Sequence, residues 1–142
     1  MKITLILLCS IFQYAFNTPV ANTTALSINN LDFELGGEVR IHIFKKQAIE
    51  LGLEMEPVEK LEVPIKKAPY LILPELDPGE YMIAVFHDSN HNGKMDFNFF
   101  GKPKEGFGFS GEFICKVKTQ NPESHYIRLN AGSQEITINV CY

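Results

Sequence analysis

The chain has 142 residues, which is enough for one domain of ordinary size. Hydrophobic residues make up 45% of it and charged residues 21%, both normal values for a globular protein. The formal net charge is −4 and there is no cluster of lysine or arginine, so the composition argues against binding to the phosphate backbone of a nucleic acid.

The N-terminal residues 1–21 have the pattern of a signal peptide. Lys2 supplies a minimal positive charge, and residues 3–16 form an apolar run that suits the hydrophobic region of a signal but is short for a membrane span. Small residues fit cleavage between about residues 15 and 21. We therefore expect an exported protein, periplasmic or secreted, whose mature part is a single domain at residues 22–142 without a transmembrane span.

Three cysteines are present, and the first lies within the expected signal. Cys9 raises the alternative of a lipoprotein, but Leu8 stands where a lipidation motif has a small residue. Cys115 and Cys141 could pair in an oxidising compartment. If both lie on the strands expected for their segments, one side chain faces the core and the other faces solvent. Strand parity therefore favours two free thiols, and a disulfide stays open as the alternative.

Short runs of alternating apolar and polar residues predict an all-β fold. In the clearest run, residues 38–44, every second side chain from Val39 to Ile43 is expected to face the core, and Arg40 to face solvent. Residues 45–56 are the only helix-tolerant segment, and we interpret them as an irregular connection. Strands are expected at residues 24–31, 38–44, 58–65, 69–73, 81–86, 112–118, 125–129 and 135–142.

A turn at residues 77–80 precedes the longest apolar run of the mature chain. Pro78 and Gly79 predict a type II turn, in which Gly79 takes a positive φ. The strand that follows, residues 81–86, is apolar on both faces and is therefore expected to be central in its sheet. The turn resembles those of transthyretin-like and collagen-adhesin B-type sandwich domains. Together these features predict an antiparallel β-sandwich of about seven strands, immunoglobulin/transthyretin-like, with one long polar loop.

The polar loop begins at Asp88, directly after this strand. Its oxygen-bearing side chains recur at every second position around Gly93, as in the first nine positions of an EF-hand calcium loop. Phe99 stands where such a loop has its bidentate glutamate, so low affinity is expected, with Glu105 folding back, the loop's own side chains or water as replacement. The candidate ligands are the side chains of Asp88, Asn90, Asn92, Asp96 and Asn98 and the backbone carbonyl of Lys94.

The same residues also describe a loop without a metal. Asp and Asn side chains commonly accept hydrogen bonds from backbone N–H groups in turns, so a calcium loop and a metal-free Asx-turn loop are both open. The second half of the loop interleaves glycine with Phe99, Phe100, Phe107 and Phe109. These rings either form a contact surface for an envelope protein or a carbohydrate, or anchor the long loop to the sandwich.

Two long motifs resemble a single family. Residues 87–98 (HDSNHNGKMDFN) and 101–110 (GKPKEGFGFS) are similar to the signature of the exported bacterial family known as domain of unknown function 2141. The strand at residues 39–44 and the Pro-Gly-x-Tyr turn at residues 78–81 extend the resemblance over the body of the mature chain. A Pro-x-Phe segment that the family often carries is missing near Pro122. The resemblance implies an envelope or secreted β-sandwich, with no established activity to carry over.

The spacing of polar residues does not favour catalysis. His87 and Asp88 are adjacent on a strand and would point to opposite faces, and Ser110 lacks the second glycine of a nucleophile elbow. We therefore expect no enzymatic activity. We interpret the chain as an exported cell-envelope β-sandwich module, structural or binding, with a low-affinity calcium loop at residues 88–98. The alternative is a metal-free accessory protein or small-ligand carrier whose polar loop is held by Asx turns.

Overall fold

The computed structural model describes residues 22–46, 56–115 and 121–142. No helix within these ranges is long and apolar enough to cross a membrane. The strands are β1 (Thr23–Asn29), β2 (Glu38–Lys45), β3 (Glu59–Pro64), β4 (Tyr70–Ile72), β5 (Gly79–Asp88), β6 (Phe107–Phe109), β7 (Tyr126–Leu129) and β8 (Ser133–Asn139). Three short 3₁₀ helices are η1 (Phe33–Leu35), η2 (Ile65–Lys67) and η3 (Pro122–His125).

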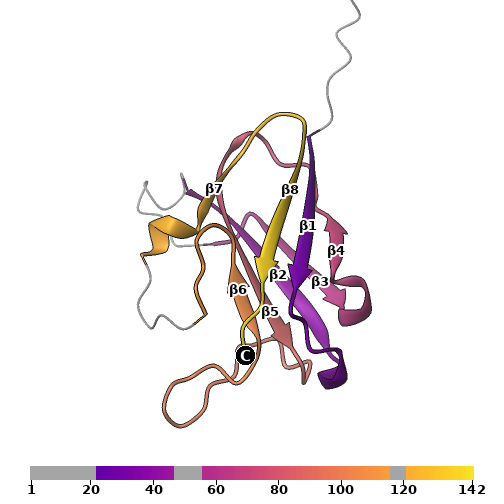
Figure 1. The fold of residues 1–142 in the computed structure, drawn as a ribbon, viewed down its shortest axis with the longest axis vertical. Helices are drawn as coiled ribbons and strands as arrows, with labels where there is room; N and C mark the ends of the chain where they lie inside the picture. Colours follow the sequence, from indigo (N-terminus) through magenta and orange to yellow (C-terminus); the bar gives the residue numbers. More distant parts are fainter. Residues whose placement is uncertain (1–21, 47–55, 116–120) are drawn as a thin grey trace, which may run out of the picture.

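The strands form two sheets (Figure 1). One sheet has the order β4–β1–β8, and the other has the order β3–β2–β5. The far edge of β5 is shared by β7, along residues 79–82, and by β6, along residues 84–86. β1 and β8 run parallel, whereas the other named strand pairs are antiparallel. The expected all-β sandwich is confirmed, and the one parallel pair is a departure from a purely antiparallel fold.

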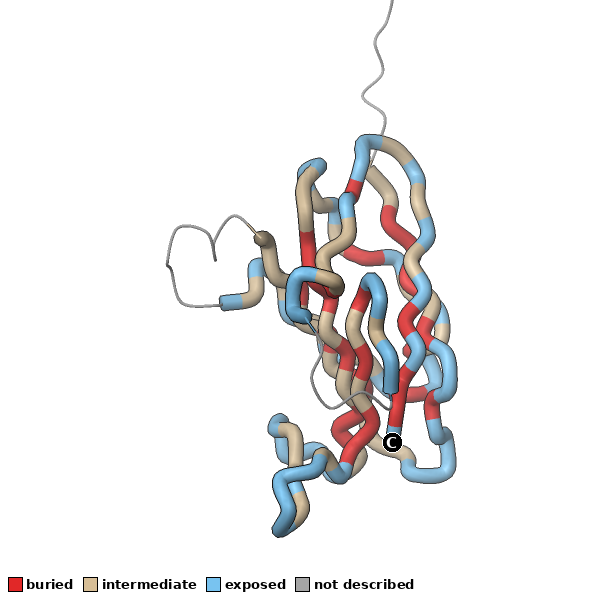
Figure 2. Tube along the Cα trace, turned by 60° about the vertical axis from the view of Figure 1, so that its left-hand side comes forward, coloured by how far each residue is buried: buried red, intermediate tan, exposed pale blue. Residues whose placement is uncertain are grey.

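The hydrophobic core contains residues from both sheets. Val39, Ile41 and Ile43 of β2 are fully buried, as their alternation predicted. They share one apolar cluster with Leu26 of β1 and Ile138 of β8. The buried segments follow the inner strands (Figure 2). β5 lies between β2 and the edge formed by β6 and β7, so the expectation that its apolar run is central is confirmed.

The turn before β5 differs from the expected type II turn. Gly79 is not among the residues with positive φ; it begins β5 and pairs with Leu129 of β7. A residue in a strand ladder has an extended backbone, which excludes the left-handed conformation. The entry to β5 is stabilised instead by Tyr81, whose hydroxyl donates a hydrogen bond to the carbonyl oxygen of Asp77 at 2.9 Å.

The strand expected at residues 112–118 is wrong. Residues 112–115 have no strand structure, and residues 116–120 lie outside the described part of the chain. The strand at this edge of the sheet is instead β6, within the segment expected to be loop. Gly108 lets β6 pass close to the end of β8, because a Cβ at this position would collide with the carbonyl oxygen of Asn139. The glycines that suggested a loop are therefore part of a closely packed strand.

Cys115 and Cys141 form a disulfide, with their Cα atoms 5.6 Å apart. The parity argument against this bond is wrong because Cys115 lies outside any strand and its direction is not set by alternation. The bond joins the segment after β6 to the C-terminal end of the chain. The expected signal peptide at residues 1–21, with Cys9, and most of the connection at residues 45–56 lie outside the described residues.

Candidate functional site

The β5–β6 loop (residues 89–106) projects from one end of the sandwich (Figure 1). Asp88, the last residue of β5, is fully buried at its base. Gly37 permits this position: it has a φ of +78°, and a Cβ on it would collide with the carbonyl oxygen of Asp88. Figure 2 shows that the outer part of the loop is largely exposed, so a buried base carries a projecting tip.

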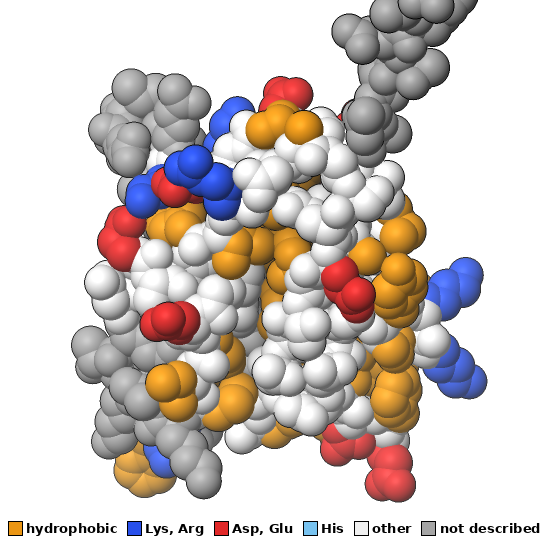
Figure 3. Space-filling view, turned by 45° about the horizontal axis from the view of Figure 1, so that its top comes forward, with side chains coloured by type: hydrophobic (Ala, Val, Ile, Leu, Met, Phe, Trp, Pro, Cys, Tyr) orange, Lys and Arg blue, Asp and Glu red, His pale blue; other side chains and the backbone are white. Residues whose placement is uncertain are grey.

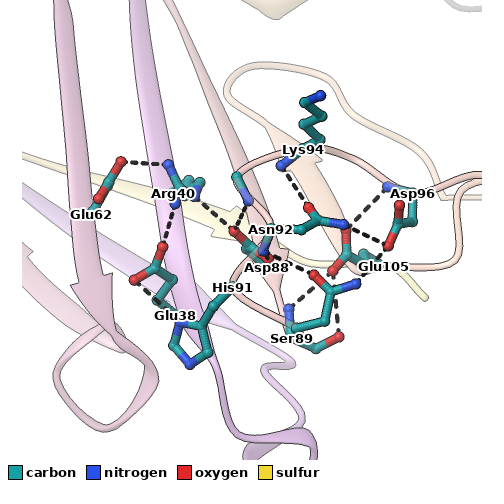
Figure 4. Close-up of polar contacts among 12 residues, drawn as sticks. Glu38, Arg40, Glu62, Asp88, Ser89, His91, Asn92, Lys94, Asp96 and Glu105 are labelled. Atoms are coloured by element: carbon teal, nitrogen blue, oxygen red, sulfur yellow. Dashed lines mark hydrogen bonds and ion pairs between the residues drawn. The ribbon is translucent and has the colours of Figure 1, made fainter.

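Asp88 organises the first turn of the loop. Its Oδ1 accepts a hydrogen bond from the backbone N–H of Asn92 at 3.1 Å, and its Oδ2 accepts one from the N–H of Gly93 at 2.8 Å. Arg40 Nε donates to the same Oδ2 at 2.9 Å (Figure 4). Burial by itself would raise the pKa of Asp88, but these donors outweigh it and hold the pKa below its ordinary value. The carboxylate is therefore ionised at neutral pH.

Arg40 lies at the centre of a small ionic network. Its guanidinium contacts Glu38 at 2.6 Å, and it also pairs with Glu62 and with Asp88. Burial would lower the pKa of Arg40, but the hydrogen bond to Asp88 and the nearby carboxylates raise it overall. The alternation in β2 assigned Arg40 to the solvent face, so sequence reasoning missed its role. The side chain lies partly covered at the base of the loop and joins it to β2 and β3.

Asn90, Asn92 and Asp96 form a second cluster, farther along the loop. Asn90 Oδ1 accepts from the N–H of Asn92 at 3.0 Å, and Asn92 Oδ1 accepts from the N–H of Lys94 at 2.8 Å. The amide Nδ2 groups of Asn90 and Asn92 both donate to Asp96 Oδ2, at 2.7 and 3.0 Å. These are successive Asx turns joined through one carboxylate, and together they close the loop.

Glu105 folds back into this loop. It is almost fully buried, and its Oε1 accepts from the N–H of Ser89 at 3.0 Å while its Oε2 accepts from the N–H of Asp96 at 3.2 Å. The carboxylate therefore holds the two arms of the loop together (Figure 4). Asn98 does not join the cluster, because its Oδ1 accepts from the N–H groups of Phe100 and Lys102 in a separate turn.

The structure thus brings together four of the predicted side chains, Asp88, Asn90, Asn92 and Asp96, and adds Glu105. Lys94 takes part through its backbone N–H, and Asn98 belongs to the tip. In the structure the loop is closed by amide and backbone donors. Its carboxylate and amide oxygen atoms are of the type that Ca²⁺ prefers as ligands.

The four phenylalanines of the predicted contact surface occupy two different environments. Phe99 and Phe100 are 97% and 84% exposed at the tip of the loop. Phe107 and Phe109 lie in β6, half-buried, with the ring of Phe113 packed 5.6 and 5.3 Å from theirs. The pair in β6 therefore anchors the loop to the sandwich, and the pair at the tip is free to contact another molecule.

His87 and Ser110 are both buried and both serve the fold. His87 Nε2 lies 2.6 Å from the carbonyl oxygen of Gly36, and Nδ1 lies 2.6 Å from the hydroxyl of Tyr142. Ser110 Oγ accepts from the N–H of Ile83 and donates to the carbonyl oxygen of His125. The role of Tyr142, at the end of the chain, gave no signal in the sequence.

Comparison with known proteins identifies a family. The family model described as "Uncharacterized protein conserved in bacteria (DUF2141)" matches residues 27–139, so the chain belongs to this family. The matched region runs from within β1 to the end of β8 and includes the whole β5–β6 loop. Searches of curated proteins and of solved structures gave no significant match.

Proposed function

We propose that this member of the DUF2141 family is an exported cell-envelope module that binds a partner through the tip of its β5–β6 loop. One observation carries the proposal: Phe99 and Phe100 are 97% and 84% exposed on a loop whose base is fixed by buried polar contacts. Large apolar side chains presented on a rigid element are typical of a contact surface rather than of the free surface of a monomer.

Two observations support export. The apolar run at residues 3–16 suits a signal peptide, and the disulfide between Cys115 and Cys141 suits an oxidising compartment. The test is the N-terminal sequence of the protein recovered outside the cytoplasm of its host. A mature N-terminus between residues 16 and 22 is the expected result. An intact Met1 on a cytoplasmic protein would contradict export.

The binding role is tested by retention on fractions of the cell envelope. The double variant Phe99→Ser/Phe100→Ser removes the exposed rings without touching the buried base of the loop, so it should keep the thermal stability of the wild type and lose retention. Ile72→Ser is the matched control, since Ile72 is also an exposed apolar residue but lies in β4, in the other sheet. Equal retention of both variants would rule out the tip as the contact surface.

We further propose that Ca²⁺ binds weakly to the loop at residues 88–98. The support is the convergence of Asp88, Asn90, Asn92 and Asp96 in one loop. The loop has no glutamate at its twelfth position, but Glu105 folds back toward the arms of the loop and could supply the missing carboxylate. A ligand that binds only the folded state stabilises it by about 1.4 kcal/mol at tenfold excess over Kd. Millimolar Ca²⁺ should therefore raise the unfolding temperature by a few degrees compared with a chelator.

The alternative is a metal-free loop in an accessory or carrier protein, and a specific observation favours it too: the amide nitrogens of Asn90 and Asn92 already satisfy Asp96. For such a carrier, a hollow of about 260 Å³ beside Tyr81, at the other end of β5, is a candidate ligand site. Its walls also include Lys45, Val58, Glu59, Glu75, Leu76 and Asp77.

Asn92→Asp separates the two states of the loop. In the calcium loop the added carboxylate should strengthen binding and enlarge the thermal shift. In the metal-free loop it places a like charge beside Asp96, so it should only destabilise the protein, with or without Ca²⁺. Asp96→Ala should abolish any calcium-dependent shift, and Glu34→Ala, an exposed carboxylate outside the loop, should leave it unchanged. No shift in the wild type or in Asn92→Asp up to about 10 mM Ca²⁺ would end the case for calcium.

A further inference from the structure

We propose that the partner of the loop tip is a lipid bilayer with anionic headgroups, an inference that rests on the proposed binding function and names its partner. The tip hairpin (residues 96–104) is a small hairpin closed by a hydrogen bond from the N–H of Lys104 to the carbonyl oxygen of Asp96 at 2.8 Å. A bridge between Phe97 and Pro103 continues it. The hairpin points away from the body of the sandwich (Figure 1).

The apex of the tip hairpin is a turn closed by hydrogen bonds within the hairpin. The N–H of Gly101, at a φ of +73°, donates to the carbonyl oxygen of Asn98 at 2.9 Å. Asn98 Oδ1 accepts from the N–H groups of Phe100 and Lys102 at 2.9 and 3.0 Å. Phe99 and Phe100 thus occupy the two central positions of a tight turn, where Gly, Pro, Asn and Asp are the residues that turn geometry favours. Turn chemistry therefore gives no reason for two phenylalanines at this apex.

The charge of the tip complements an anionic surface. Lys102 and Lys104 of the tip hairpin and Lys94 just before it are exposed, and in the part of the chain that the structure describes none of the three makes an ion pair. The nearby carboxylates of Asp96 and Glu105 are engaged in hydrogen bonds inside the loop. The tip hairpin carries two lysines, Lys102 and Lys104, against one carboxylate, Asp96, and so has a small positive charge on a chain whose net charge is −4. Lysines near a membrane surface are attracted by anionic lipid headgroups.

The shape of the apex favours a bilayer over the other partners. The rings of Phe99 and Phe100 are nearly perpendicular, at 86° with centroids 5.6 Å apart, and so form a wedge rather than the flat platform on which a sugar ring stacks. Two projecting side chains are also far smaller than the patch of about 800 Å² that a stable protein interface buries on each partner. Two exposed apolar rings at the apex, followed in sequence by Lys102 and Lys104, suit a bilayer, where rings enter the acyl region and lysines stay at the phosphates.

Figure 3 shows another face of the molecule, on which one group at the upper left mixes acidic and basic side chains and other charged groups stand alone. Lys66 and Lys67 are exposed and, like the lysines of the tip, form no ion pair with described residues. Unpaired lysines alone therefore do not distinguish the tip hairpin. It is distinguished by Phe99 and Phe100, the two most exposed large hydrophobic side chains among the described residues.

The absence of tryptophan from the chain makes a direct test possible. Phe100→Trp places a single fluorophore at the apex, and Ile72→Trp places one at an exposed apolar site in β4 as the matched control. Each protein is mixed with vesicles of equal parts phosphatidylglycerol and phosphatidylethanolamine, with and without brominated acyl chains, and with vesicles of phosphatidylcholine alone. Because the readout is local, binding through residues 1–21 does not affect the comparison.

The expected result is a blue shift and bromine quenching of Phe100→Trp in the anionic vesicles, and neither change in Ile72→Trp. Phe99→Ser/Phe100→Ser should lower partitioning into these vesicles by about a hundredfold, as measured by sedimentation with the wild type as reference. Lys102→Glu/Lys104→Glu should lower it by about tenfold or more.

Three outcomes would overturn the inference or part of its basis. Equal insertion into phosphatidylcholine would overturn the assignment of anionic headgroups. If the apex fluorophore is unmoved by vesicles while the serine variant still loses retention on envelope protein or glycan, the lipid inference fails and the proposed binding function stands with another partner. If vesicles have no effect and the serine variant is retained as well as the wild type, both fail.

Discussion

Single residues at the base of the β5–β6 loop decide how that loop is held. Asp88 is fully buried, and its carboxylate is shared between two backbone N–H groups and Arg40. A buried, ionised carboxylate stabilises the fold only when it accepts hydrogen bonds from the surrounding donors. Removing its charge leaves those donors without their acceptor. Asp88 therefore has a structural role whether or not the loop also binds Ca²⁺.

Asp88→Asn should lower the free energy of unfolding by about 3 kcal/mol at neutral pH. The pH dependence follows from the direction of the pKa shift: the folded-state value lies below the ordinary aspartate value of 3.8. The stabilisation by Asp88 is therefore fully present above that value and is lost as the pH falls through the lower, folded-state pKa. Urea unfolding between pH 7 and pH 2 should show a shallower acid limb in Asp88→Asn than in the wild type.

Glu62→Gln is the control for this comparison. Glu62 pairs with the same arginine but is exposed, so its removal should cost less than about 1 kcal/mol. Acid limbs of equal slope in the wild type and in Asp88→Asn would show that Asp88 is not the group responsible.

Tyr142, the last residue of the sequence, also holds buried polar groups near the end of β5. The hydroxyl of Tyr142 lies 2.6 Å from Nδ1 of the fully buried His87 and accepts the N–H of Asp32 at 2.9 Å. Because the carbonyl of Gly36 can only accept, Nε2 of His87 donates to it, and Nδ1 and the Tyr142 hydroxyl share the second hydrogen bond. The C-terminus is thereby tied to the end of β5.

Tyr142→Phe should therefore destabilise the protein by about 1–3 kcal/mol, because it leaves Nδ1 of His87 and the N–H of Asp32 without this partner. Chemical denaturation followed by circular dichroism measures the change. Tyr70→Phe removes an equivalent hydroxyl from an exposed position on β4 and should change stability by less than about 0.5 kcal/mol. Similar small effects from both substitutions would mean that water satisfies His87 equally well.

At the scale of elements, the glycine-rich motif after the tip hairpin is explained largely by packing. Glu105 holds the arms of the β5–β6 loop, Gly106 lies against the ring of Tyr142, and Gly108 lies against the backbone of Asn139. Ser110 then joins β5 to the start of β7. Packing within the fold therefore accounts for these residues of the motif, whereas it does not account for the exposed pair at the tip.

The sequence predicted the elements that follow simple alternation, and it failed where a residue's role depends on distant contacts. β2 and β5 were evident because their buried faces are apolar at every second position. β6 could not be predicted from the sequence because Gly108 weakens the strand pattern. Glycine is needed there because the end of β8, which is remote in sequence, approaches closely. In the site, spacing predicted Asp88, Asn90, Asn92 and Asp96, but no local signal indicated Arg40, which joins them from β2.

The disulfide acts on an element rather than on a single contact. It joins Cys115, after β6, to Cys141, after β8, across 26 residues of chain. In the chain-entropy account a closed loop of this length stabilises the fold by about 3.5 kcal/mol. Cys115→Ala/Cys141→Ala should lose about that amount in denaturant unfolding. Dithiothreitol should destabilise the wild type similarly and leave the variant unchanged; equal unfolding midpoints for wild type and variant would contradict this role.

At the scale of the whole molecule, the parallel pairing of β1 with β8 closes the fold. Ile28 lies opposite Ile138, 110 positions away, whereas Ile43 of β2 lies opposite Ile83 of β5, 40 positions away. With the disulfide formed, the path runs from Ile28 to Cys115 and back from Cys141 to Ile138, which shortens the longer closure only from 110 positions to about 91. The chain closed by pairing β1 with β8 thus remains more than twice as long as the chain closed by pairing β2 with β5. Each doubling of the length of a closed chain costs about 0.6 kcal/mol of additional conformational entropy.

We therefore expect the sheet containing β2 and β5 to form before β8 docks on β1. The same substitution at two buried positions tests this order. Ile83→Val and Ile138→Val should each cost about 1 kcal/mol, since both side chains are fully enclosed. Ile83→Val should mainly slow folding, and Ile138→Val should mainly speed unfolding, because only the first contact is formed in the transition state. Stopped-flow kinetics followed by tyrosine fluorescence gives both rates, and a slower folding rate in Ile138→Val alone would reverse the order.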